Sequence, residues 1–409
     1  MQVSKLLRET IDLEGFRIAD VEKEDNVLIA MIERDGRYAL RCGSCGERAR
    51  YRDKRFERSF RHVPLWGIPV NLRYTPCRVD CESCGIRQER MPWTAGQKKR
   101  MTHALACTLA MWVRKVTIAE AARMFRCSWN TVSDALEYVV EYGLRHRDLS
   151  GIKHIGVDEI SQRRGHVYLT NVYDLDTSTL IWSGPGRSKE TLRAFFEWFG
   201  PERAARLEGV CCDMWQPYIA MIKEHAPDAI LVFDKFHVAQ HLSRAVDQVR
   251  RNEIRAKGKA HKEVVAGARY VFLKNPENLT GNQRKSLGFF MKLNLQITKA
   301  YLLKEAFRKF WQYTRPGWAE NYLEKWFWWA THSRLKPMRD FAWMLRRHQK
   351  NILAYFKLRM TNAGSEGMNN KAKAISHRAY GFRTPKYFIL NMYHCLGRLP
   401  EPQLTHTFL

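Results

Sequence analysis

The N-terminal part of the chain alternates hydrophobic and polar positions, which is the period of a half-buried strand. Residues 26–41 alternate around Asp35-Gly36, a dipeptide that favours a tight turn, so they predict a hairpin. Residues 68–74 alternate again and predict a further strand. We therefore expect this part of the chain to be rich in β-structure.

Between residues 102 and 142 the hydrophobic period lengthens to that of an amphipathic helix. Thr117 and Glu120 have the spacing of a capping box, and a second helix would open near Ser128 after a short turn. This pattern resembles a helix-turn-helix, whose second helix enters the major groove of DNA. Two ordinary packed helices would give the same pattern. In the DNA-binding interpretation, the residues at the base edges would be Trp129, Asn130, Thr131 and Ser133.

From residue 151 onward strand and helix patterns mix. Strands are predicted over 153–161, 166–173, 179–183, 209–213 and 229–233, and helices over 188–199 and 217–224. The first three strands have short connections and should be antiparallel neighbours. Three such strands followed by alternating helix and strand predict a mixed sheet of the ribonuclease-H-like kind.

After residue 238 the strand pattern stops, and residues 239–358 are helical in character. An insertion of this length is expected to form a helical subdomain. Its aromatic cluster around Trp311, Trp318 and residues 326–329 is interpreted as core rather than as a base-stacking platform. Beyond it we expect a helix that carries Glu366 and a last helix over 385–396.

The charge of the chain narrows the class of partner. Its 69 lysine and arginine residues against 42 aspartate and glutamate residues give a formal net charge of +27. Double-stranded DNA is the natural partner, because each cation that neutralises a phosphate releases a counterion. A ribosome-associated protein, or one that is basic only for solubility, is the alternative. Neither a signal-peptide segment nor a run of about eighteen apolar residues occurs, so we expect a cytoplasmic, nucleoid-associated protein with no membrane partner.

Four of the ten cysteines form two Cys-x-x-Cys pairs, Cys42/Cys45 and Cys81/Cys84, each followed by a glycine. In an intracellular protein such pairs favour a metal site over disulfides. Four thiolates suit a tetrahedral structural Zn2+, one per chain. Cys77 is a spare thiol that could replace one ligand, and buried cysteines without metal are the alternative.

Three carboxylates lie where elements end or begin. Residues 154–158 and 209–213 are β-prone runs that end in Asp158 and Asp213, and Glu366 stands at the expected start of a helix. Such residues can meet at one edge of a sheet, where they would bind hard divalent cations through oxygen. This is the outline of a phosphoryl-transfer site. Glu159 ranks below Asp158 as a ligand, because neighbouring residues on a strand point to opposite faces.

Arginines that could contact DNA phosphates gather in two places. One is the loop between the cysteine pairs, and the other is the basic and aromatic segment 377–383. The candidates are Arg48, Arg50, Arg52, Arg378 and Arg383. An arginine-rich solvated face would have the same composition.

The order of these motifs resembles the ISL3 family of bacterial insertion-sequence transposases. The resemblance rests on Gly156-Val-Asp-Glu159, Cys212-Asp-Met-Trp215, Val232-Phe-Asp-Lys-Phe-His237, Glu366-Gly-Met-Asn-Asn-Lys and Arg378-Ala-Tyr-Gly-Phe-Arg383. The paired cysteines and the helix-turn-helix match as well, so the resemblance covers nearly the whole chain. Cys77 is the one departure, and it leaves the zinc ligand set open.

The resemblance implies a DDE transposase that binds terminal inverted repeats and catalyses metal-dependent DNA cleavage and strand transfer. Its triad maps onto Asp158, Asp213 and Glu366, which would hold two Mg2+ or Mn2+ ions, with Asp234 and His237 beside the active site. Joining two DNA ends requires a homodimer or a higher oligomer. A catalytically silent DNA-binding regulator and a structure-specific ribonuclease-H-like nuclease are the alternatives.

The expected fold is multidomain. A β-rich zinc-binding domain (1–95) precedes a helix-turn-helix domain (96–150). The α/β ribonuclease-H-like catalytic core (151–240 and 359–409) is interrupted by an all-α insertion (241–358).

Overall fold

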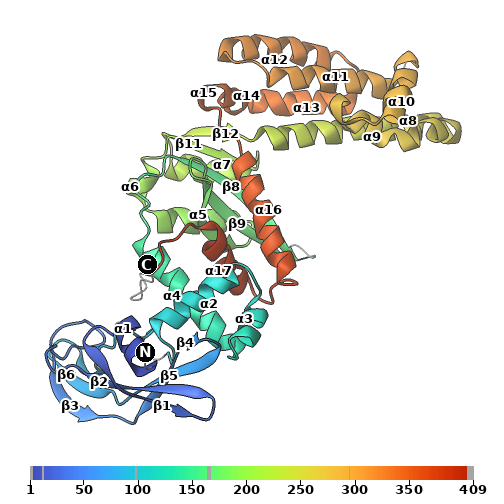
Figure 1. The fold of residues 1–409 in the computed structure, drawn as a ribbon. Helices are drawn as coiled ribbons and strands as arrows, with labels where there is room; N and C mark the ends of the chain where they lie inside the picture. The colour runs from blue at the N-terminus through green and yellow to red at the C-terminus, as the bar shows by residue number, and fades with distance from the viewer. Residues whose placement is uncertain (1–2, 12, 97–98, 164–166, 294, 403–409) are drawn as a thin grey trace. The chain divides into compact units, whose positions relative to one another are not determined.

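The computed structural model describes residues 3–11, 13–96, 99–163, 167–293 and 295–402 (Figure 1). The chain forms two compact units, one of residues 1–148 together with 372–409 and the other of residues 149–371. Helix α16 (Ala363–Arg378) begins in the second unit and ends in the first. Within the described ranges, no helix has both the length and the apolar character that crossing a membrane requires.

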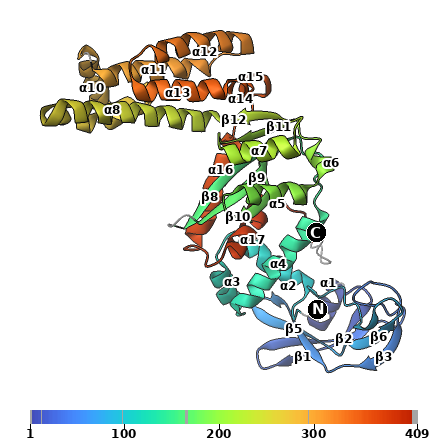
Figure 2. The same cartoon turned by 180° about the vertical axis from the view of Figure 1, so that it is seen from behind.

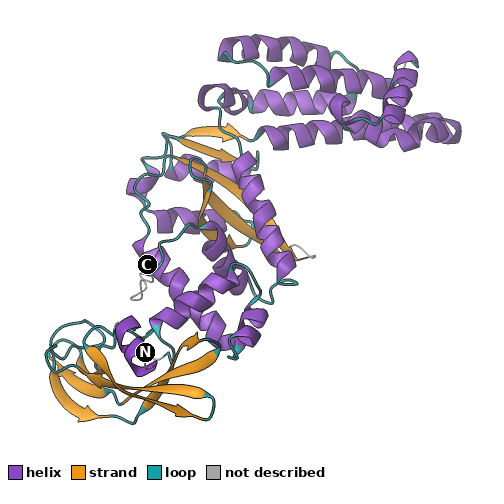
Figure 3. Ribbon diagram, viewed as in Figure 1, coloured by secondary structure: helices purple, strands orange, loops and turns teal. Residues whose placement is uncertain are grey.

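The N-terminal part of the first unit is rich in strands, as the alternating sequence predicts (orange in Figure 3). Its elements are α1 (Val3–Thr10), β1 (Phe16–Glu24), β2 (Val27–Arg34), β3 (Arg50–Lys54), β4 (Arg58–Leu65), β5 (Ile68–Tyr74), β6 (Cys77–Cys81) and β7 (Gly85–Gln88). One sheet has the order β1-β2-β5-β4, with β2 and β5 parallel, and the other has the antiparallel order β3-β6-β7. The strand predicted over 68–74 is confirmed as β5.

The hairpin predicted around Asp35-Gly36 is wrong. β2 pairs with β1, which precedes it, so the hairpin turn lies at Asp25 and Asn26. Asp25 has a positive φ of 52°, a conformation that Asp and Asn tolerate better than most residues. Both dipeptides carry turn chemistry, and the partner strand decides which of them closes a hairpin.

Besides α1, which the sequence pattern does not predict, four helices of the first unit begin where the sequence predicts. They are α2 (His103–Val113), α3 (Ile118–Met124), α4 (Trp129–His146) and α17 (Pro385–Leu396). The capping box is present, because Thr117 Oγ1 accepts from the Glu120 N–H at 3.1 Å and Glu120 Oε2 from the Thr117 N–H at 2.8 Å. Ser128 Oγ accepts from the Thr131 N–H at 3.1 Å and caps α4. Helix α17 packs against α4.

The second unit contains the predicted mixed sheet. Its elements are β8 (His154–Arg163), β9 (Val167–Asp174), β10 (Thr179–Pro185), α5 (Lys189–Phe199), α6 (Pro201–Ala204), β11 (Gly209–Cys212), α7 (Gln216–His225) and β12 (Ile230–Phe233). The sheet order is β10-β9-β8-β11-β12, in which the first three strands are antiparallel and β8, β11 and β12 are parallel. The strand start predicted at residue 166 lies outside the described residues.

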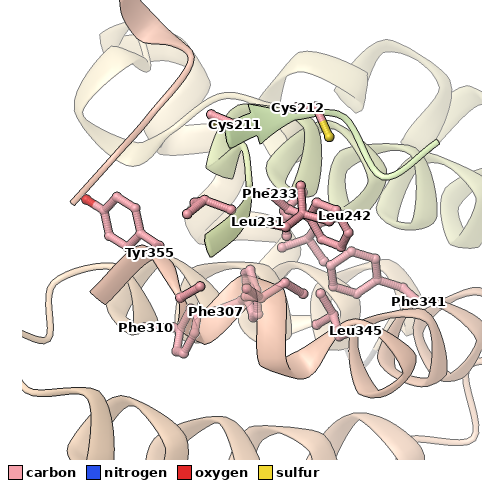
Figure 4. Close-up of a cluster of buried hydrophobic side chains, with 14 of the residues drawn as sticks. Cys211, Cys212, Leu231, Phe233, Leu242, Phe307, Phe310, Phe341, Leu345 and Tyr355 are labelled. Carbon is pink, nitrogen blue, oxygen red and sulfur yellow. The ribbon is translucent and has the colours of Figure 1, made fainter. Parts of the chain in front are cut away.

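The described residues between 235 and 358 are mostly helical, and Figure 2 shows these helices from behind. They are α8 (Lys235–Val265), α9 (Arg269–Leu273), α10 (Gly281–Lys292), α11 (Gln296–Phe310), α12 (Pro316–Thr331), α13 (Lys336–Arg347), α14 (Gln349–Leu353) and α15 (Tyr355–Leu358). Their apolar side chains join those of the sheet in one buried cluster, where Phe233 of β12 lies near Phe307 and Phe341 (Figure 4). This shared core anchors the insertion to the strands that carry the candidate site.

The interpretation of the insertion's aromatic residues as core is right for part of the set. Trp326 is 3% exposed and donates from Nε1 to the Leu303 carbonyl, and Trp311 packs against the same core. Trp318 and Trp328 are 65% and 63% exposed, so for these two the prediction is wrong. They lie on the outward face of α12, whose buried face already holds Trp326 and Leu323.

Candidate active site and cysteine cluster

Three aspartates lie level with one another across three neighbouring parallel strands. Cys211 of β11 lies opposite Gly156 of β8 and Val232 of β12. Continuing both registers by two residues puts Asp213 level with Asp158 on one side and with Asp234 on the other. Neighbouring strands are about 4.8 Å apart, so the backbone positions of the three aspartates lie along one line across the sheet. Asp213 and Asp234 follow the ends of β11 and β12, whereas Asp158 lies in the middle of the longer β8.

Asp158 is held by two hydrogen bonds. Its Oδ1 accepts from the Glu159 N–H and its Oδ2 from Asn369 Nδ2, both at 2.8 Å. Burial raises the pKa of Asp158 to about 6, although the Glu159 N–H acts in the opposite direction. Burial also raises the pKa of Asp234, which His237 partly offsets. Burial therefore disfavours the charged form of both carboxyl groups.

Asn369 connects α16 to the sheet. Its Oδ1 accepts from the Tyr173 hydroxyl at 2.6 Å and from Asn171 Nδ2 at 3.2 Å. Asn171 accepts in turn from the Ser183 hydroxyl at 2.7 Å. The network is buried and runs through β9 and β10, so it fixes both the side chain of Asn369 and the carboxylate of Asp158.

The start of α16 is held by a second set of contacts. Asn362 donates from Nδ2 to the Val157 carbonyl at 3.1 Å and from its backbone N–H to Asp234 Oδ1 at 3.3 Å. Gly156 makes this approach possible, because a Cβ there would lie 2.4 Å from Asn362 Oδ1 and 2.5 Å from Ser365 Oγ. Asp234 therefore helps to place α16 on the sheet.

Glu366 lies in the first turn of α16, three residues before Asn369. Side chains at this spacing are neighbours on a helix surface, so Glu366 stands one turn from the residue that binds Asp158. Its side chain is exposed. Among the described residues, Asp158, Asp213 and Glu366 do not form a group of ligand atoms close enough together to hold an ion. Asp158 and Asp213 thus lie on neighbouring strands, and Glu366 lies on the helix whose Asn369 binds Asp158.

Two histidines of α8 lie beside Asp213. His237 Nδ1 is 3.9 Å from Asp213 Oδ1. His241 follows one turn later; burial lowers its pKa, and the nearby charge of Asp213 raises it. The position of His237 next to Asp213 is the one that the resemblance implies.

The side chain of Glu159 has a cationic partner. Arg187, which precedes α5, pairs through Nε with Glu159 Oε1 at 3.2 Å. Arg187 Nη2 is also 4.0 Å from Asp213 Oδ2. Burial raises the pKa of Glu159, and Arg187 lowers it. Arg187, Asn362 and Asn369 were all missed by the sequence analysis; the two asparagines lie close to Glu366 in the chain, but Arg187 carries no comparable signal.

The four predicted zinc ligands come together. The ligand atoms of Cys42, Cys45, Cys81 and Cys84 all lie within 4.8 Å of one another, and a tetrahedral four-thiolate zinc site needs sulfur atoms about 3.8 Å apart. Gly46 and Gly85 have φ of 79° and 66°, as tight knuckle turns require. The residues therefore fit a structural Zn2+.

Cys77 stands apart from this group of four. It is buried, and its backbone N–H donates to Glu89 Oε1 at 2.6 Å. Burial raises the pKa of the Cys77 thiol to about 12, and Glu89 adds to this effect. Within the part of the chain that the structure describes, the group of ligand atoms that lie within 4.8 Å of one another does not include Cys77, so its position does not suit a zinc ligand.

The candidate base-reading residues of α4 differ in exposure. Asn130 is exposed and Thr131 is partly exposed. Trp129 packs edge-on against Tyr387 of α17, with ring centroids 4.9 Å apart. Ser133 is only 5% exposed, because it faces the helices that pack on α4, so its hydroxyl is not presented to a ligand.

The candidate phosphate-binding arginines also differ. Arg48, Arg50, Arg52 and Arg383 are exposed. Arg378 instead donates to the carbonyls of Arg114 at 2.6 Å and Val113 at 3.1 Å, at the end of α2. Its guanidinium is used within the first unit, where it satisfies helix carbonyls that lack partners.

Comparisons with known proteins identify the family of the chain. The ISL3 family of DDE transposases, described as a transposase family, matches residues 155–392, which contain the three carboxylates. The chain is 31% identical to the transposase for insertion sequence element IS1001 of Bordetella parapertussis, over 95% of this chain and 97% of that protein. It is 30% identical to the transposase for insertion sequence element IS1557 of Mycobacterium tuberculosis, over 94% and 93%. These findings confirm the resemblance seen in the motifs: the chain belongs to the ISL3 family of DDE transposases, enzymes that cleave DNA and transfer its strands.

Proposed function

We propose that this transposase cuts and joins the ends of its own insertion sequence with Asp158, Asp213 and Glu366 as its metal-binding carboxylates. The level positions of Asp158 and Asp213 on neighbouring strands carry the proposal. The helix of Glu366 is docked on the same sheet through Asn369 and Asp158. A sheet with three antiparallel strands and two further parallel ones supports a ribonuclease-H-like core.

The residues of the site divide the work. Two Mg2+ or Mn2+ ions held by the carboxylates would generate the nucleophile from water and stabilise the leaving 3′ oxygen. Asn369 holds the carboxylate of Asp158, and Asp234 holds the start of the helix that carries Glu366. His237, beside Asp213, is placed to orient the nucleophile or the scissile phosphate. A 3′-OH freed at the element end would then attack target DNA in the same site.

DNA recognition would fall to the first unit. The paired helices α3 and α4, with Trp129 and Asn130 exposed and Thr131 partly exposed at the start of α4, support a helix-turn-helix that reads the terminal inverted repeats. Ser133 is left out of this set because it is buried. The cysteine cluster would hold one structural Zn2+ and fix the segment of Arg48 and strand β3, which carries Arg50 and Arg52. Two DNA ends must be joined, so we propose a dimer or a higher oligomer on DNA.

The deciding experiment uses DNA that carries the two ends flanking this gene. Wild-type protein, Asp158→Asn and Asp213→Asn are incubated with it in Mg2+, in Mn2+ and in EDTA. Cleavage at the end junctions by the wild type alone, and only with metal, is the expected result. End-specific binding without cleavage in any metal would overturn the proposal in favour of a DNA-binding regulator.

A further inference from the structure

The backbone around Arg187 is fixed on both sides. The Gly186 N–H donates to the Tyr168 carbonyl at 2.8 Å, and the Gly186 carbonyl accepts from Thr170 Oγ1 at 2.8 Å. Gly186 has a φ of 102°, a conformation that favours glycine. On the other side, Ser188 Oγ accepts from the Thr191 N–H at 3.2 Å and caps α5. The side chain of Arg187 therefore starts from a well-defined point.

The guanidinium of Arg187 is itself held in place beside Asp213. Arg187 Nε pairs with Glu159. The guanidinium carbon, Cζ, lies 5.3 Å from the ring centroid of Trp215 and 5.9 Å from that of Tyr168. Such contacts between a guanidinium and aromatic rings are attractive and restrict its orientation. Arg187 contacts Glu159 through Nε, and its Nη2 lies 4.0 Å from Asp213 Oδ2, so the guanidinium spans the two carboxylates.

If Arg187 were only the counterion of Glu159, its side chain would not need to be exposed to solvent. The Glu159 side chain is 12% exposed, whereas that of Arg187 is 37% exposed and lies 4.0 Å from Asp213. A cation at this position also weakens the attraction of Asp213 for a metal ion, so it needs a compensating role. An incoming phosphodiester supplies one, because its non-bridging oxygens must approach the carboxylates within a few ångströms to react there. Arginine binds such oxygens through two parallel N–H donors.

We propose that Arg187 is a phosphate-binding residue of the active site, whose Nη donors bind the non-bridging oxygens of the phosphodiester that is cut. Glu159 and Trp215 are positioning residues, because they act by orienting the guanidinium. This inference rests on the proposed function, in which Asp213 belongs to the active site.

The test compares two DNA substrates in single-turnover cleavage. One has a normal scissile phosphodiester, and the other has an uncharged methylphosphonate at that position. We expect Arg187→Ala to slow cleavage of the normal substrate about 100- to 1,000-fold, the usual effect of losing a donor to a developing oxyanion. On the methylphosphonate, the wild type and Arg187→Ala should differ by only a few-fold, because the charge that Arg187 binds is missing. End binding in gel-shift assays should change less than about threefold, since many other phosphate contacts persist.

Control variants separate this role from a structural one. Arg193→Ala removes a different arginine, which lies on α5, and should leave cleavage of both substrates unchanged. Arg187→Lys keeps the charge without the fork and should recover only part of the rate. An equal loss on both substrates in Arg187→Ala would overturn the inference. The inference would also be overturned if Arg187→Ala cleaved the normal substrate at the wild-type rate. Cleavage that survives in Asp213→Asn would instead refute the proposed site itself, whatever Arg187 does.

Discussion

At the scale of single residues, the protonation of Asp158 leads to a prediction about pH. Burial raises its pKa to about 6, so protons and metal ions compete for this carboxylate near neutral pH. We expect end cleavage to fall as the pH drops through about 6, because the protonated acid cannot bind the cation. A tenfold higher Mg2+ concentration should move the midpoint to lower pH. Single-turnover rates between about pH 5.5 and 8 at two Mg2+ concentrations measure both effects. A midpoint that does not move with the Mg2+ concentration would contradict the assignment of Asp158 as a metal ligand.

Asn369 offers a second prediction at this scale. Its amide is the side-chain donor to Asp158 Oδ2, at 2.8 Å. Asn369→Ala should slow cleavage about 10- to 100-fold and raise the Mg2+ concentration needed for half-maximal rate, as loss of a hydrogen bond to a metal ligand typically does. The neighbouring Asn370 is exposed, so Asn370→Ala is the matched control and should cleave normally. Equal effects of the two substitutions, or loss of end binding, would argue that Asn369 only stabilises the fold.

At the scale of elements, the close approach of α16 to β8 depends on Gly156. A Cβ at this position would lie 2.4 Å from Asn362 Oδ1 and 2.7 Å from Leu175 Cδ2. Gly156→Ala should lower the free energy of unfolding by about 1 to 3 kcal/mol, the usual cost of overpacking. It should also impair cleavage more than DNA binding, since it displaces the helix that carries Glu366.

Urea unfolding and end cleavage are the measurements for this substitution. Gly151 has no atom within 4 Å of the equivalent Cβ position, so Gly151→Ala is the control and should change neither quantity appreciably. A Gly156→Ala protein with wild-type stability and rate would show that α16 is not held as closely as these contacts require.

The cysteine cluster gives a prediction about zinc. Cys45→Ser should reduce the bound zinc from about one ion per chain to near zero, because three thiolates bind the ion much more weakly than four. Cys77→Ala should keep the zinc, since Cys77 lies outside the group of four ligands. Metal analysis of protein purified without chelator makes the comparison. If Cys45→Ser kept its zinc and Cys77→Ala lost it, Cys77 rather than Cys45 would be the zinc ligand.

The elements of this fold were largely predictable because they depend on local sequence. The capping box of Thr117 and Glu120, the strand over Ile68–Tyr74 and the helix over Pro385–Leu396 all follow from patterns within a few residues. The error at Asp35-Gly36 has a different origin. Two turn-forming dipeptides flank β2, and only the pairing of β2 with β1 decides between them.

The candidate site was predictable in its acidic residues and not in their partners. Asp158 and Asp213 stand out because carboxylates follow β-prone runs. The donor to Asp158 lies 211 positions away in the chain, and contacts at such separation leave no periodic trace in one sequence. Arg187 was hidden for another reason: among 69 lysine and arginine residues, a single arginine before a helix carries no distinguishing pattern.

At the scale of the whole molecule, the net charge of +27 contrasts with the acidic candidate site. Asp158, Glu159, Asp213 and Asp234 gather in the second unit, where a DNA backbone would be repelled without bound cations. Three exposed arginines belong to the first unit: Arg48, which lies before β3, and Arg50 and Arg52, which lie within β3. Binding and cutting are therefore expected to respond differently to salt and to metal.

Substitution of these three arginines tests whether they supply phosphate contacts. The logarithm of the affinity for end DNA should fall linearly with the logarithm of salt concentration, by about 0.9 for each phosphate neutralised. Replacing all three arginines by alanine should lower this slope by about 2 to 3 and weaken specific and non-specific DNA equally. Arg37→Ala is the matched control, because Arg37 is exposed but already paired with Asp35 at 2.6 Å, so its slope should change much less. If the triple variant keeps its zinc and its slope, these arginines form a solvated face, and the phosphate contacts must come from other basic residues of the chain.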